Sequence, residues 1–122
     1  MIRAAAMALR ICGGLALILG LVVWLLHIEG ILVPIHMLLG LLVALSLAIL
    51  GYAITAIRGG SLGMGIGAFV LAILVIVLGL TQQSLLIGDL HWIVQVVHLL
   101  LGVGAIGMGE IINRRYSSIT KA

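Results

Sequence analysis

The chain has 122 residues, of which 65% are hydrophobic and only 7% are charged. This composition excludes an ordinary soluble domain and is typical of an integral membrane protein. The net charge of +3 is too small to indicate a nucleic-acid partner, so we expect none and assign the basic residues to topology and to anionic headgroups of the lipid bilayer. A membrane-crossing helix needs about 20 apolar residues, so four such helices fit within this length.

Four apolar stretches follow one another along the chain. In order they cover 8–27, 31–57, 62–80 and 90–112. The breaks between them contain the glycine and polar residues that are typical of turns. We therefore predict an all-α fold, an integral membrane four-helix bundle that forms a single transmembrane domain over residues 1–122.

The basic residues predict the orientation of this bundle. All six fall on one side of a four-span chain, and they are Arg3, Arg10, Arg58, Arg114, Arg115 and Lys121. Because cytoplasmic segments of membrane proteins are enriched in such residues, both termini and the central loop are expected to be cytoplasmic. The sequence thus predicts a multi-pass protein of the cell inner (plasma) membrane, with its other two loops facing outward.

The sequence also contains an internal repeat. Positions 36–40 read His-Met-Leu-Leu-Gly, and positions 98–102, 62 residues later, read His-Leu-Leu-Leu-Gly. Halves of about 1–60 and 61–122 are then parallel-repeat helical hairpins that enter the membrane in the same direction. The second and fourth helices run parallel, which puts His36 and His98 at matched depth in the outer half of the bilayer.

These two histidines are the strongest functional signal in the chain, since an ionisable residue inside a membrane is costly and usually functional. In a bundle packed in sequence order, the second and fourth helices are diagonal, so His36 and His98 can meet across the interior. The pair fits the two axial ligands of haem b. Gly40 and Gly102 lie one turn deeper on the same faces, where they leave room for a porphyrin.

Other interpretations of the same residues stay open. The histidines could have a structural or hydrogen-bonding role, or they could bind another metal or a magnesium-centred pigment. The glycines could be ordinary sites of close helix packing.

A second group of polar residues is expected in the outer loops. His27 and Glu29 end the first loop region, and Asp89 and His91 occupy the second. The repeat pairs an acid in one half with an imidazole in the other, which predicts cross-loop pairs of His27 with Asp89 and of Glu29 with His91. The alternatives are surface charges near headgroups, contacts to haem propionates, a proton-exchange site, or a divalent metal site such as zinc.

Three segments resemble one half of a haem A synthase. Residues 83–88 read Gln-Ser-Leu-Leu-Ile-Gly, residues 96–102 read Val-Val-His-Leu-Leu-Leu-Gly, and residues 35–40 read Ile-His-Met-Leu-Leu-Gly. The resemblance implies a four-helix unit with haem-binding histidines on the second and fourth helices. It also implies an outer-loop glutamate, for which Glu29 is the counterpart, whereas the arginine that often follows the first histidine is Met37 here. Four-helix membrane b-type cytochromes are similar in the same general way.

Three classes of function are consistent with this sequence. The first is a haem b-binding electron-transfer subunit of a respiratory or photosynthetic complex, without catalytic activity of its own. Its partners would be other membrane subunits, with a quinol or an external cytochrome as redox partner. The second is a half-length, haem A synthase-like haem-modifying enzyme, in which a homodimer recreates the full-length arrangement. The third is a non-redox accessory, assembly or pigment-binding subunit.

Overall fold

The structure, a computed structural model, describes residues 1–122 and is entirely helical. Its elements are α1 (Ile2–Leu26), α2 (Leu32–Ala56), α3 (Leu62–Thr81), the short 3-10 helix η1 (Gln82–Ser84) and α4 (His91–Lys121). Each of the four α-helices is long and apolar enough to cross a membrane. The predictions of an all-α chain and of four potential spans are therefore confirmed.

The first and last helices are longer than their apolar stretches. α1 already begins at Ile2 and α4 continues to Lys121, because backbone hydrogen bonding continues through polar ends that hydropathy excludes. Arg3 and Arg10, two of the basic residues that predict the orientation, both lie within α1. At the start of α3 a side-chain cap sets the helix boundary. Ser61 accepts a hydrogen bond from the Met64 N–H at 3.2 Å.

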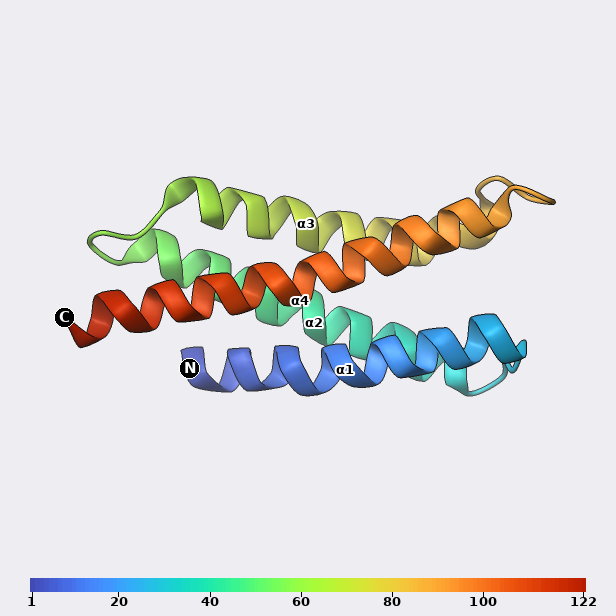
Figure 1. Cartoon of the computed structure of the whole chain (residues 1–122), viewed down its shortest axis with the longest axis horizontal. Coiled ribbons are helices and arrows are strands. Elements are labelled where there is room, and N and C mark those ends of the chain that lie inside the picture. The colour runs from blue at the N-terminus through green and yellow to red at the C-terminus, as the bar shows by residue number, and fades with distance from the viewer.

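The helices pack side by side along a common long direction (Figure 1). Both termini and the α2–α3 loop lie at one end of the bundle, and the α1–α2 and α3–α4 loops lie at the other (Figure 1). Helices that are consecutive in the sequence are in contact, and α4 returns to contact α1. Across the bundle, α2 contacts α4, whereas α1 and α3 do not touch each other. The predicted diagonal relationship between the second and fourth helices is thus present.

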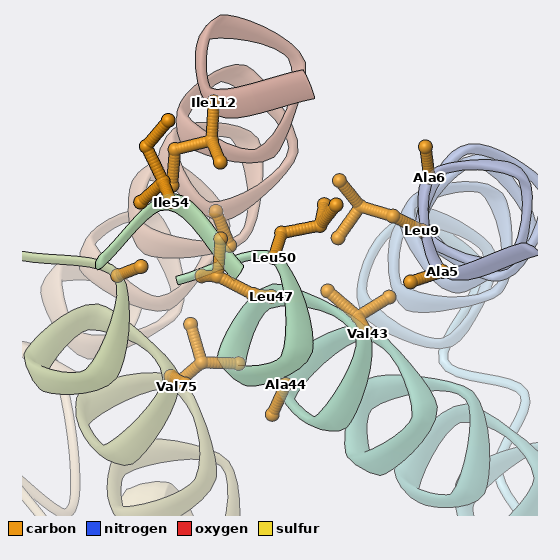
Figure 2. Packing of buried hydrophobic residues seen from close by; sticks show 13 residues of the cluster. Ala5, Ala6, Leu9, Val43, Ala44, Leu47, Leu50, Ile54, Val75 and Ile112 are labelled. Atoms are coloured by element: carbon orange, nitrogen blue, oxygen red, sulfur yellow. The ribbon is translucent and has the colours of Figure 1, made fainter. Parts of the chain in front are cut away.

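The hydrophobic core lies in the half of the bundle that contains the chain termini. Its largest fully buried side chains are Leu9, Leu47, Leu50, Ile54 and Ile112. Figure 2 shows them converging from α1, α2 and α4. Only 21 of 122 residues are buried, and large aliphatic side chains cover the outside of every helix. Such a surface suits lipid contact, because aliphatic side chains in hydrocarbon incur no hydration cost.

Small residues allow the helices to approach closely. A Cβ atom on Gly51 of α2 would lie 2.8 Å from the Cβ of Ala68 on α3, and one on Gly13 of α1 would lie 2.7 Å from Cδ1 of Ile106 on α4. Both distances are shorter than a normal contact between carbon atoms. These glycines therefore set the spacing of the helices that carry the site described next.

Candidate functional site

The two histidines of the internal repeat face each other across the bundle. His36 extends from α2 and His98 from α4, and their ring centroids are 6.1 Å apart with an angle of 72° between the ring planes. Both side chains are half-buried. The structure therefore brings together the two residues that the sequence predicts as a pair.

The imidazole of His36 has a defined tautomer. Its Nδ1 lies 2.9 Å from the backbone carbonyl oxygen of Ala16 on α1. A carbonyl oxygen only accepts hydrogen bonds, so Nδ1 carries the proton and, in the neutral ring, Nε2 keeps its lone pair. A histidine held in this way by a backbone carbonyl has the arrangement typical of metal-binding histidines.

The imidazole of His98 is less well satisfied. Its Nδ1 is buried and has no hydrogen-bond partner. An unsatisfied buried polar group costs about 1–3 kcal/mol, and in native folds such groups generally have a functional explanation or an additional partner. The nitrogen without a partner thus belongs to one of the two residues that the sequence selects as ligands.

Each imidazole lies against a glycine of the preceding helix. A Cβ atom on Gly20 of α1 would lie 3.0 Å from Cε1 of His36, and one on Gly79 of α3 would lie 3.2 Å from Cε1 of His98. Sequence reasoning missed both glycines, because their separation along the chain differs from that of the histidines. The sequence does contain an indication of this role, since each of the two preceding helices has a glycine near its C-terminal end.

The two glycines predicted to leave room for a porphyrin have few neighbours. A Cβ atom on Gly40 would meet no heavy atom within 4 Å, and one on Gly102 would meet only Cδ2 of Leu17, at 3.9 Å. Space is therefore available one turn deeper than each histidine. The role of this space in accommodating a porphyrin stays a prediction.

The four polar residues predicted for the outer loops form neither a metal-binding group nor the two cross-loop ion pairs. The structure contains no group of three or more histidine, cysteine or acidic side chains that could hold a metal ion. It contains no ion pair between His27 and Asp89 or between Glu29 and His91. His27 instead ends α1 in a left-handed conformation with φ 54°, and the Nδ1 of His91 lies 3.0 Å from the carbonyl oxygen of Leu85.

An ion pair that the sequence analysis did not anticipate joins the first and last helices. The guanidinium of Arg10 on α1 donates through Nε to Oε1 of Glu110 on α4, and through Nη2 to Oε2 at 3.0 Å. Glu110 is an acid inside an apolar run, which is itself a signal for a partnered residue. This ion pair links α1 to α4. It lies between the histidine pair and the end of the bundle that contains the chain termini.

Comparison with known protein families, curated proteins and solved structures finds no match to this chain. The resemblance to haem A synthases and b-type cytochromes accordingly stays a prediction, and the functional assignment depends on the geometry of the histidine pair.

Proposed function

We propose that this protein is a haem b-binding electron-transfer subunit of an integral membrane complex, with His36 and His98 as the two axial ligands. The observation that carries this proposal is the juxtaposition of the two imidazoles, with the Nδ1–H of His36 engaged by Ala16. That hydrogen bond leaves the Nε2 lone pair of His36 free for a metal.

The separation of the rings agrees with bis-histidine ligation. A metal shared by His36 and His98 would need the two imidazole rings to lie close together, since a metal–imidazole bond is about 2 Å long. The observed separation is 6.1 Å. The two rings meet edge to face, with an angle of 72° between their planes.

The surroundings of the pair also suit a macrocycle. The glycines that pack on the imidazoles restrict the rings, and the glycines one turn deeper leave open space beside them. When bound, haem supplies a one-electron iron couple whose potential depends on ligands, hydrogen bonds and burial. The Ala16 carbonyl would orient His36, one of the two proposed ligands.

The proposed topology follows from charge and from the position of the termini. Both termini and the α2–α3 loop share one end of the bundle (Figure 1), and the basic residues concentrate there. The positive-inside tendency makes that end cytoplasmic. His36 and His98 then lie toward the outer face, at matched depth on the second helix of each of two parallel-repeat hairpins.

A single haem at this depth cannot carry an electron across a hydrocarbon core of about 30 Å. The protein therefore acts together with others, and the proposed partners are further membrane subunits or a second copy, with a quinol or an external cytochrome as redox partner. The aliphatic side chains exposed along all four helices leave ample surface for such contacts within the bilayer.

The test is an absorption spectrum of the purified protein, reconstituted with haem b and recorded in the oxidised and reduced states. We expect low-spin haem bands that are lost in both His36→Ala and His98→Ala. The matched controls are His27→Ala and His91→Ala, which remove the remaining two histidines and should retain the bands. Bands that survive removal of His36 or His98, or a protein that takes up no haem, would overturn the proposal.

A further inference from the structure

A second candidate site lies at the opposite end of the bundle from the histidine pair. A cleft of about 510 Å³ opens between the start of α3 and the last turns of α4. It is lined by Met64, Ile111, Arg114, Arg115 and Ser118. The cleft is thus lined by both apolar and cationic side chains, and neither His36 nor His98 belongs to it.

Neither arginine of the cleft forms an ion pair. The only ion pair in the chain joins Arg10 to Glu110. The other two acids, Glu29 and Asp89, lie in the loops at the far end of the bundle. Glu110 lies within electrostatic range of Arg114, but both of its carboxylate oxygens are bound by Arg10. The guanidinium groups of the cleft therefore keep donors available for an anion, and their fork of donors matches the oxygens of a phosphate.

The depth of the cleft coincides with the membrane boundary. α3 has 20 residues, which at about 1.5 Å per residue span roughly 30 Å, the thickness of the hydrocarbon core. Met64 is in the first turn of α3 and therefore lies near the edge of that core. Arg114 and Ser118 are about one and two turns beyond Ile111 along α4, in the direction of the headgroups.

The start of α3 adds to the positive potential of the cleft. The N-terminal end of a helix carries a partial positive charge that favours anions within the first turn. Met64, which belongs to this turn, is one of the lining residues. The helix end therefore supports the same preference as the two guanidinium groups on the other wall.

From these observations we propose that the cleft binds an anionic phospholipid, with the headgroup phosphate held by Arg114 and Arg115 and the acyl chains running past Met64 and Ile111. A basic pocket between membrane helices at headgroup depth is the setting in which proteins hold anionic lipids. The bound lipid would link α3 to α4 at the cytoplasmic end of the bundle.

The test measures the thermal unfolding midpoint of the purified, detergent-solubilised protein with added phosphatidylglycerol, phosphatidylcholine or inorganic phosphate. We expect phosphatidylglycerol alone to raise the midpoint. In the double variant R114Q/R115Q the apparent affinity for phosphatidylglycerol should fall by about tenfold or more, as expected for the loss of charge-assisted hydrogen bonds. The matched control is R3Q/R58Q, which removes two charges from the same end of the bundle without altering the cleft.

A second variant separates the cleft from its charges. Ile111→Trp keeps both arginines and fills part of the cleft, so it should also weaken the response to phosphatidylglycerol. Equal responses of R114Q/R115Q and R3Q/R58Q would overturn the proposal in favour of diffuse surface attraction. An equal rise with phosphatidylcholine, or with inorganic phosphate alone, would overturn the assignment to an anionic lipid. None of these measurements depends on haem.

Discussion

A Cβ atom at position 20 would lie 3.0 Å from Cε1 of His36, so any larger residue there would push this imidazole away from its observed place against α1. Gly79 stands in the same relation to His98, at 3.2 Å. Each ring is therefore confined by the backbone of the neighbouring helix. The orientation of the two imidazoles therefore depends on two glycines, which have no side chain.

Replacing either glycine should weaken haem binding without unfolding the bundle. In Gly20→Ala and Gly79→Ala the added methyl group displaces the imidazole, and changes around metal-binding histidines typically reduce affinity about 10- to 100-fold. Haem titration followed by absorbance gives the affinity. The control is Gly14→Ala, where a Cβ meets nothing within 4 Å and better helix propensity should stabilise the apoprotein by up to roughly 1 kcal/mol. Equal haem affinity in Gly20→Ala and Gly14→Ala would contradict the role of the contact.

The open space beside Gly40 and Gly102 gives a second prediction. A leucine at either position should fill that space and block haem uptake, while the apoprotein stays helical by circular dichroism. Gly107→Leu on α4 is the control, since a Cβ there also meets nothing within 4 Å but lies more than one turn deeper than Gly102. Haem uptake by Gly40→Leu at the level of Gly107→Leu would show that the porphyrin lies elsewhere.

The ion pair between Arg10 and Glu110 predicts a non-additive effect on stability. Each single variant, Arg10→Gln or Glu110→Gln, leaves one charge inside a membrane-spanning segment without its partner, which is costly. The double variant removes both charges, so it should lose less stability than the sum of the two single losses. Unfolding midpoints of the four proteins in detergent measure this coupling. Strict additivity would mean that the two side chains do not interact.

The core predicts a contrast between two nearby leucines of α2. Leu47 is fully buried, whereas 56% of the surface of Leu45 is exposed. Leu47→Ala should therefore lower the free energy of unfolding by about 2–5 kcal/mol, the usual cost of removing a buried leucine side chain. Leu45→Ala should have a much smaller effect. Denaturation in mixed detergent micelles provides the comparison, and similar losses in both variants would place the core elsewhere.

Sequence reasoning succeeded where one strong pattern determined the structure. Runs of about 20 apolar residues fix the number of spans, and the repeated motif placed His36 and His98 on diagonal helices. The diagonal placement of α2 and α4 follows from the sequence order of the helices around the bundle, whereas their contact, which the other diagonal pair α1 and α3 lacks, does not. These features depend on hydrophobicity and spacing, which are visible in one dimension.

The remaining features depend on contacts between segments far apart in the chain. Gly20 acts through its neighbour on α2, and Arg10 through a partner on α4 that is 100 positions away, so neither role follows from local pattern. At the α1–α2 and α3–α4 loops, by contrast, the sequence pattern indicated long-range contacts that the structure does not contain. The repeat suggested cross-loop pairs for His27 and His91. Instead, His27 ends α1 in a left-handed conformation, and the imidazole of His91 contacts the carbonyl oxygen of Leu85.

The helices that carry the two histidines are also the only two that contact every other helix of the bundle. Separating α2 from α4 would therefore require both to be withdrawn from α1 and α3 as well. The distance between His36 and His98 is consequently a property of the whole fold, and it is preorganised before any cofactor arrives. Folding alone thus assembles the histidine pair, and under the proposed function a cofactor would need to shift side chains without rearranging helices.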